Sequence, residues 1–250
     1  LYASIGNFAH VNIRQVANFL KTDETESKVV FSSNRNESNV EESPIVGGPT
    51  AVVSRRSGLP QVWLFYRNGE QKQLTFFEKN ERIRSLNFAP DGKAIVIQLH
   101  NELWLLNEDF KLIQIPIDEN QIVTAPAWGA NGKYIYYTVS LNGRWQVARY
   151  DVTSRQIDPQ PFAFDQEFYL ESYDGKYSFW RDATSKKFYI KWSASGLVEE
   201  LPITLPDSQL WYKFQAKSSG IYYAFLLNDI YYQLKFFDFS TQKIQQVLND

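Results

Sequence analysis

Histidine and neighbouring carboxylates are the side chains of this sequence that could support acid–base or metal chemistry. Histidine is the commonest catalytic base and metal ligand near neutral pH. The chain has two, His10 and His100, far apart in the sequence. A metal site would need a third ligand of equal quality, and no spacing around either histidine offers one. We therefore predict that both are ordinary surface or loop residues and that the chain holds no metal.

The acidic pairs are Glu41 with Glu42 and Glu199 with Glu200. Carboxylates held about 5–10 Å apart across a cleft can hydrolyse glycosides. Residues adjacent in the sequence are more simply explained as solvated charges in loops and at strand ends. The sequence also lacks cysteine, a Gly-x-Ser-x-Gly elbow, sialidase-type aspartate boxes and a Gly-rich phosphate loop before a helix. These features predict a chain without catalytic residues and without a cofactor.

Arginine and tryptophan in and beside the short polar connections indicate a binding surface instead. Both residue types are enriched at the energetic centres of protein interfaces. The candidate partner-binding residues are Arg55, Arg56, Trp63, His100, Arg144 and Trp145. The same connections include Asn101, Asn142, Arg181, Asp182, Lys186, Lys187, Asn228 and Asp229. We expect these connections to cluster on one face and to contact a partner protein, an acidic peptide or a small anionic ligand. The alternative is that the arginines only keep the loops soluble.

A recurring glycine turn defines the elements that must position these residues. The turn glycines lie 40–45 residues apart and are Gly48, Gly92, Gly132, Gly175 and Gly220. Each precedes a run of apolar residues, as in NFAPDGKAIVI at residues 87–97. Asp-Gly and Asn-Gly tolerate the positive φ that tight hairpin turns demand. Asp91 and Asp174 are therefore better explained by turn geometry than by catalysis.

Each repeated unit has one strand before the glycine turn and three strands after it. Phe, Tyr and Trp make up 16% of the chain, which favours pleated, half-buried surfaces. Four strands in about 40–45 residues is the period of a β-propeller blade. A β-sandwich with accidental spacing is the alternative. No long amphipathic helix is visible, and residues 13–20, the best candidate, are short enough to be a strand.

The predicted fold is an all-β, six-bladed propeller with four antiparallel strands per blade, and seven blades are the alternative. The whole chain, residues 1–250, would be a single domain. The glycine turns anchor five blades, and residues 1–42 would supply a sixth that is incomplete at its start. The expected blades cover residues 1–42, 43–85, 86–126, 127–170, 171–213 and 214–250.

Charge and composition limit the classes of partner. The 26 basic residues are offset by 28 acidic ones, so this segment is not expected to contact nucleic acid. No stretch approaches the ~18 apolar residues of a membrane span. The sequence has no methionine and begins with Leu1, which predicts a processed product or a fragment of a longer protein. Any membrane contact would then come from an anchor outside these residues.

The turn motifs resemble the repeats of TolB-like propellers. The resemblance is carried by NFAPDGKAIVI, by APAWGANGKYIYYTV at residues 125–139, and most closely by SRRSGLPQVWLFYRNGEQKQLT at residues 54–75. It covers residues 29–150 well and residues 151–250 loosely. Such propellers include free periplasmic scaffolds, the propellers of prolyl-oligopeptidase-like peptidases, and the extracytoplasmic parts of membrane-anchored regulators of the CadC and ToxR type.

Residues 28–64 look most like the regulator group. That resemblance implies a non-enzymatic sensor or protein-interaction domain at the periplasmic face of the inner membrane. A DNA-binding winged-helix domain and a membrane span would then precede Leu1. A stand-alone TolB-like periplasmic scaffold is the first alternative. A propeller lyase or hydrolase is the second, and the shortage of histidine disfavours it.

Overall fold

The structure is a computed structural model that describes the chain except for residues 1, 8–9, 17–26, 34–36, 142, 164, 206–211, 228–230 and 250. All regular structure in the described residues is β-strand, and no helix occurs among them. The all-β prediction is therefore confirmed. Candidate residues Asn142, Asn228 and Asp229 lie outside the described residues.

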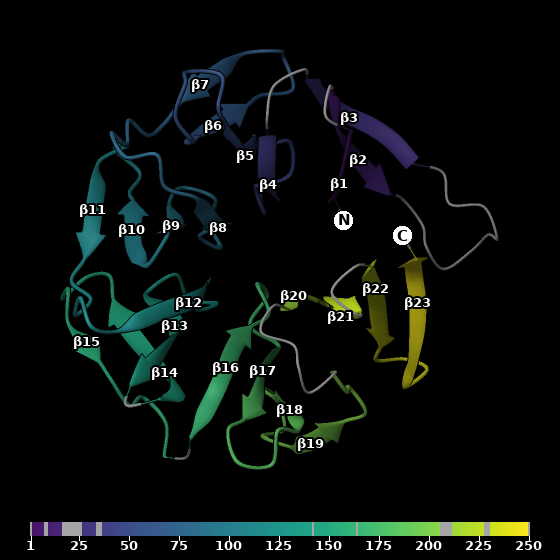
Figure 1. Cartoon of the computed structure of the whole chain (residues 1–250). Coiled ribbons are helices and arrows are strands. Elements are labelled where there is room, and N and C mark those ends of the chain that lie inside the picture. The colour runs from purple at the N-terminus through teal and green to yellow at the C-terminus, as the bar shows by residue number, and fades with distance from the viewer. Residues whose placement is uncertain are drawn as a thin grey trace. The chain divides into compact units, whose positions relative to one another are not determined.

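The described strands form five four-stranded antiparallel sheets and one three-stranded sheet (Figure 1). In each sheet the strands follow one another in chain order. The three-stranded sheet contains β1 (Tyr2–Asn7), β2 (His10–Val16) and β3 (Ser27–Ser33). The next sheet contains β4 (Glu37–Glu42), β5 (Thr50–Ser54), β6 (Gln61–Phe65) and β7 (Gln71–Gln73). It is followed by β8 (Ile83–Phe88), β9 (Ile95–Leu99), β10 (Glu102–Leu106) and β11 (Leu112–Ile115).

The remaining three sheets repeat the same order. The first contains β12 (Ile122–Trp128), β13 (Tyr134–Leu141), β14 (Arg144–Asp151) and β15 (Ile157–Asp158). The second contains β16 (Gln166–Glu171), β17 (Tyr177–Asp182), β18 (Phe188–Trp192) and β19 (Val198–Leu201). The third contains β20 (Tyr212–Lys217), β21 (Gly220–Leu227), β22 (Tyr231–Asp238) and β23 (Lys243–Asn249). Each four-stranded sheet thus has one strand before its glycine turn and three strands after it, as predicted.

The predicted number of six blades, with seven as the alternative, is wrong. Among the described residues five sheets have the four strands of a blade, and the sheet of β1 to β3 has only three. The strand at residues 37–42 does not complete that first sheet. It pairs with β5, from Glu37 opposite Ser54 to Glu42 opposite Thr50, and so belongs to the following blade. The glycine turns therefore located each of these five blades, and the described part of residues 1–33 forms a sheet of three strands.

The Asp-Gly and Asn-Gly turns have the expected conformation. Gly92 has a φ of +70° and its N–H donates to the carbonyl of Ala89 at 2.8 Å. The carboxylate of Asp91 accepts the N–H of Lys93 at 3.0 Å. Asp174 accepts the N–H of Lys176 in the same way, at 3.2 Å. Both aspartates thus shape turns, which confirms the geometric interpretation of their role.

The chain divides into two compact units, Leu1–Pro126 and Ala127–Asp250. In the first unit, neighbouring sheets touch through their first strands, since β4 contacts both β1 and β8. Aliphatic side chains such as Val53, Leu64, Leu86 and Ile97 form a buried cluster shared by the sheets of β4–β7 and β8–β11. In the second unit, β16 contacts β13 and β14 of the preceding sheet.

Aromatic side chains form much of the core of the second unit. Phe179 is fully buried, and its ring lies 5.3 Å from that of Phe188 and 5.0 Å from that of Phe214. Phe168 packs against the same Phe179 ring at 5.8 Å. Aromatic pairs at these distances add about 0.5–1.5 kcal/mol each beyond the area they bury. Phe168, Phe179 and Phe188 belong to one sheet and Phe214 to the next, so these rings cover one face of a sheet and join it to its neighbour.

Candidate functional site

The predicted binding residues all lie in or near the connections between the second and third strands of the blades. Successive antiparallel strands reverse direction, so these connections share one end of each sheet with the segment that leads to the next sheet. We call this the loop end. The Asp-Gly turns lie at the opposite end. Each unit has its own loop end, and the two are described separately.

Arg55 and His100 are exposed side chains at the loop end of the first unit. The Nη1 of Arg55 donates to the Oδ1 of Asn80 at 2.9 Å. His100 has a φ of +49° and its backbone N–H donates to the carbonyl of Arg82 at 2.9 Å. Its own carbonyl accepts the Nε2 of Gln98 at 3.1 Å. His100 is thus the backbone corner of a tight turn.

Arg56 and Trp63 are brought together, as a shared binding surface requires. The guanidinium of Arg56 lies 5.1 Å from the ring centroid of Trp63 and 4.7 Å from that of Phe65. Its Nε donates to the Oγ of Ser54 at 3.1 Å, and its Nη1 donates to Gln71. Arg56 therefore contacts three strands of its own sheet, β5, β6 and β7. The buried Nε1 of Trp63 has no hydrogen-bond partner among the described residues.

Arg144 and Trp145 begin β14 at the loop end of the second unit. They stand opposite Leu141 and Ser140 in the β13–β14 ladder. Both are exposed, and 36% of the Trp145 surface is open to solvent. No ion pair of Arg144 is found within the described part of the chain. The structure thus places an exposed arginine and an exposed tryptophan side by side in sequence at this loop end.

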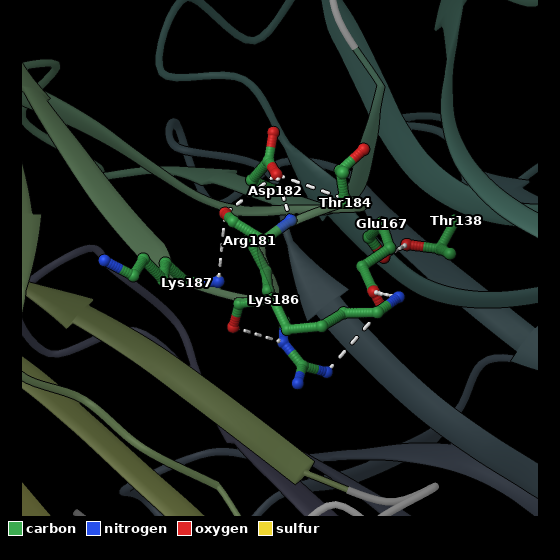
Figure 2. Close-up of polar contacts among 8 residues, drawn as sticks. Thr138, Glu167, Arg181, Asp182, Thr184, Lys186 and Lys187 are labelled. Atoms are coloured by element: carbon green, nitrogen blue, oxygen red, sulfur yellow. Dashed lines mark hydrogen bonds and ion pairs between the residues drawn. The ribbon is translucent and has the colours of Figure 1, made fainter.

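The β17–β18 loop is held in one conformation by Asp182 (Figure 2). Its Oδ1 accepts the N–H of Thr184 at 3.1 Å and both the N–H and the hydroxyl of Ser185, at 2.6 and 2.8 Å. The loop closes through Lys186, whose φ is +60° and whose N–H donates to the carbonyl of Asp182 at 3.1 Å. The predicted residues Asp182 and Lys186 therefore both stabilise the β17–β18 loop.

The same Asp-led loop recurs twice in the second unit. The carboxylate of Asp151 accepts two backbone N–H groups, and Arg155 takes the positive φ of 59°. Asp238 and Gln242, with φ of 56°, repeat the arrangement. The sequences are Asp-Val-Thr-Ser-Arg, Asp-Ala-Thr-Ser-Lys and Asp-Phe-Ser-Thr-Gln. This spacing of Asp and two hydroxyl residues is a local signal that sequence reasoning missed.

A buried carboxylate, Glu167, joins the β17–β18 loop to the neighbouring blade. It is 9% exposed, and the Nζ of Lys186 lies 3.0 and 2.8 Å from its two oxygens. The Nη1 of Arg181 lies 3.6 Å from the same carboxylate, and its Nε donates to the carbonyl of Lys186 at 3.1 Å. The hydroxyl of Thr138 donates to the Glu167 carbonyl at 3.0 Å. Figure 2 shows these groups converging on Glu167.

Replacing Asp182 tests this loop through its pH dependence. Partial burial opposes ionisation of Asp182, but hydrogen bonds from Ser185 and Thr184 outweigh it and lower the pKa of this carboxyl below its ordinary 3.8. The ionised form is favoured in the folded state, so its stabilisation is complete above pH 3.8 and is lost as the pH falls through the folded pKa. Asp182→Asn should reduce the free energy of unfolding at pH 7 by about 0.5–1 kcal/mol.

When the pH falls from 6 to 3, the free energy of unfolding should decrease less in Asp182→Asn than in the wild type. Urea unfolding at the two pH values measures both effects. Glu119→Gln, which neutralises an exposed carboxylate in another blade, is the control and should behave as the wild type. An Asp182→Asn protein with the wild-type pH dependence would contradict the assignment.

The histidines and carboxylates of interest can be located in the described part of the chain. No group of three or more His, Asp or Glu there could hold a metal ion. Glu199 accepts the Nε1 of Trp192 at 2.6 Å, while Glu200 pairs with Lys187 at 2.8 Å. Successive residues of a strand point to opposite faces, so the two carboxylates do not face a common substrate. Burial raises the pKa of Tyr136 to about 12, which keeps this phenol protonated.

Among the described residues there is no helix with the length and hydropathy of a membrane span. No protein-family model matches the sequence, and no curated protein matches it. Solved structures do match. TolB from Acinetobacter baumannii superposes with a TM-score of 0.65 at 19% identity, over 96% of this chain and 59% of that one. The chain therefore spans less than two thirds of that TolB.

Two further structures show the range of proteins with this fold. A chain of a nidogen/laminin complex superposes with a TM-score of 0.66 at 10% identity, over 99% of this chain and 91% of that one. The oligogalacturonate lyase of Vibrio parahaemolyticus gives a TM-score of 0.53 at 11% identity, over 82% and 63%. Identities this low show the fold alone, which is a β-propeller. TolB is among the solved propellers with this fold, in keeping with the resemblance of the turn motifs to TolB-like repeats.

Proposed function

We propose that this chain is a non-enzymatic, protein-binding propeller that acts as a periplasmic scaffold of the TolB kind. The observation that carries the proposal is the loop end of the second unit. There an exposed Arg144 and Trp145 accompany a loop that Asp182 and Glu167 hold in place. Exposed aromatic and arginine side chains are the usual anchors of protein interfaces.

The lyase alternative needs groups that the described residues do not bring together. His100 is exposed in a turn. The Asp182 carboxylate accepts backbone N–H groups of its own loop, and the Glu167 carboxylate is paired with Lys186. A nidogen/laminin complex and a TolB have the same fold at higher TM-scores than the lyase. The nidogen/laminin structure is a complex of two proteins, which supports the proposed binding role.

A sensor domain of a membrane-anchored regulator is the second candidate. It is supported by the resemblance of residues 28–64 to the regulators, whereas the superposition on TolB favours the free scaffold. The gene sequence upstream of Leu1 separates the two. A winged-helix segment followed by a membrane span would favour the regulator, and a cleavable signal sequence would favour the scaffold. Recovery of the protein in the cytoplasmic fraction of cells would contradict both.

Replacing Arg144 and Trp145 by alanine tests the binding surface. Loss of a tryptophan anchor commonly costs 2 kcal/mol or more, so the double variant should bind its cross-linked and identified partner about thirtyfold more weakly. Surface plasmon resonance on the purified pair measures the change. The control removes Arg155 and Leu197, an exposed pair at the opposite end of the same unit. Equal weakening in both double variants would contradict the proposal.

Arg55 and Arg56 provide the matching test in the first unit. Arg55→Ala loses the Asn80 contact, whereas Arg56→Ala loses the hydrogen bonds to Ser54 and Gln71 and removes the cation from the Trp63 and Phe65 rings. If these arginines belong to the interface, binding falls in Arg55→Ala without loss of thermal stability. Unchanged affinity in both variants would limit the interface to the second unit.

A further inference from the structure

Two large apolar side chains are exposed among the described residues at the loop end of the first unit. Phe76, in the connection from β7 to β8, is 75% exposed, and Ile122, at the start of β12, is 57% exposed. In the connections that follow β11 and β19, the exposed residue after the buried end of the strand is a proline, Pro116 or Pro202. The fold therefore does not require an aromatic ring at the position of Phe76.

The backbone on both sides of Phe76 is held by one buried carboxamide. Gln61 is 3% exposed, and its Oε1 accepts the hydroxyl of Thr75 at 2.8 Å and the N–H of Phe77 at 2.9 Å. Its Nε2 donates to the carbonyl of Phe77 at 2.8 Å. The ring of Phe77 packs against Trp104 of the next blade, with the centroids 5.7 Å apart. The chain is thus anchored immediately before and after Phe76, while the Phe76 ring stays in solvent.

Asn101 holds the backbone around Ile122 in the same manner. Its Oδ1 accepts the N–H of Val123 at 2.8 Å, and its Nδ2 donates to the carbonyl of Gln121. The carbonyl of Val123 also accepts the Nε2 of Gln98, at 2.8 Å. Both apolar side chains are therefore presented by backbone that is already fixed, so little backbone entropy is lost when a partner covers them.

The β9–β10 corner contacts both of these connections. Glu102, next to Asn101, accepts the Nε1 of Trp104 at 2.9 Å and lies 3.6 Å from the Nζ of Lys79, three residues after Phe76. The exposed His100 stands at the same corner. We call Phe76, His100 and Ile122 the corner surface.

The charges around the corner surface differ between its two sides. The cations in these connections and corners are Arg55, Arg56, Lys79 and Arg82, and the carboxylates are Glu78, Glu81, Glu102, Asp118 and Glu119. Near Phe76 the two signs are mixed, and Lys79 pairs with Glu102. The connection that leads to Ile122 has Asp118 and Glu119 and no cation, and neither carboxylate has an ion pair among the described residues. This side attracts a positive group and repels an anionic lipid surface.

We propose that the corner surface receives a segment of a partner protein. Apolar side chains of this segment cover Phe76 and Ile122, and a basic side chain meets Asp118 and Glu119. An apolar centre with an aromatic anchor and a charged rim is the usual anatomy of a protein interface. The proposal rests on the proposed function, since it adds a surface of the first unit to the protein-binding face and names the chemistry of the partner.

Site-specific photo-cross-linking of the full chain in cells tests the surface. A benzophenone amino acid replaces Phe76, and in the control it replaces Phe110, an exposed aromatic residue at the opposite end of the same unit. We expect an adduct with one protein, identified by mass spectrometry, from position 76 and not from position 110. No adduct from position 76, the same adduct from both positions, or an adduct between two copies of this chain would overturn the proposal.

Binding of the identified and purified partner measures the contribution of the ring. Phe76→Ala should weaken binding about tenfold or more, as expected for an interface anchor. Its thermal stability should equal that of the wild type, because the ring is exposed. Phe110→Ala removes the same ring from the opposite end and should change the affinity less than about twofold. Equal weakening by the two variants would contradict the corner surface.

Neutralising Asp118 and Glu119 tests the charge of the partner. Asp118→Asn combined with Glu119→Gln should slow association about threefold and make it less sensitive to NaCl, since charges at a rim act mainly on the association rate. An unchanged rate and salt dependence would contradict a basic side chain at this position.

Vesicles of phosphatidylethanolamine and phosphatidylglycerol distinguish a lipid surface from a protein. We expect the chain to stay in the supernatant when these vesicles are sedimented. Sedimentation with vesicles that is lost in Phe76→Ala would overturn the assignment to a protein. A protein adduct from position 145 together with none from position 76 would retain the proposed function while this inference fails.

Discussion

Gly220→Ala is expected to reduce the free energy of unfolding by about 3 kcal/mol. A Cβ on this residue would lie 2.1 Å from the carbonyl oxygen of Phe237 and 2.5 Å from the ring of Phe236. Gly220 stands opposite Asp238 in the β21–β22 ladder, so the backbone carbonyl cannot move away without breaking that pairing. Urea unfolding followed by tryptophan fluorescence measures the loss.

Gly132→Ala is the matched control for this substitution. Gly132 has a φ of +67°, and a Cβ there meets nothing within 4 Å. Its cost is therefore conformational strain alone, about 1–2 kcal/mol. A Gly220→Ala protein as stable as Gly132→Ala would show that β21 and β22 are less closely packed than described.

Arg181→Ala is expected to reduce the free energy of unfolding by about 2–3 kcal/mol, nearly as much as Gly220→Ala. It removes one of the two cations that contact the buried Glu167 carboxylate. The Arg181 side chain is 13% exposed and also lies over the ring of Phe188, 5.5 Å from its centroid. Removal of one partner of a buried pair leaves a charge without full compensation. We also expect faster amide hydrogen exchange in residues 183–186, since Arg181 donates to the carbonyl of Lys186.

Lys187→Ala provides the comparison from the same loop. Its pair with Glu200 is about half exposed on both sides, at 54% and 49%, so its loss should change the free energy of unfolding far less than the loss of Arg181. Similar destabilisation by Arg181→Ala and Lys187→Ala would contradict the special role of the Glu167 cluster. If the loop amides of Arg181→Ala exchanged as slowly as those of the wild type, the expected effect of Arg181 on the loop would be contradicted.

Much of the fold could be predicted from local features of the sequence. Asp-Gly turns impose positive φ over a few residues, and alternating aromatic runs mark strands, so Gly92 and Gly175 located their blades. The blade count failed where this signal is absent. No glycine turn of this kind organises residues 1–33, and only the pairing of β4 with β5 shows where Glu37–Glu42 belongs.

The candidate site was predicted less completely, because its contacts join distant residues. Arg56 and Trp63 are close in sequence and do meet across one hairpin. Glu167 and Lys186 are 19 residues apart, and their pairing depends on how β16 lies against the β17–β18 loop. A glutamate within the apolar run QEFYLE was the available signal.

The most direct measurement of the central claim is site-specific photo-cross-linking in living cells. A benzophenone amino acid at position 145 places the reactive group at the loop end of the second unit, and one at position 197 places it at the opposite end, at an exposed leucine. We predict a discrete protein adduct from position 145 that is absent from position 197. Adducts from both positions, or none from position 145, would contradict a protein-binding surface at the loop end.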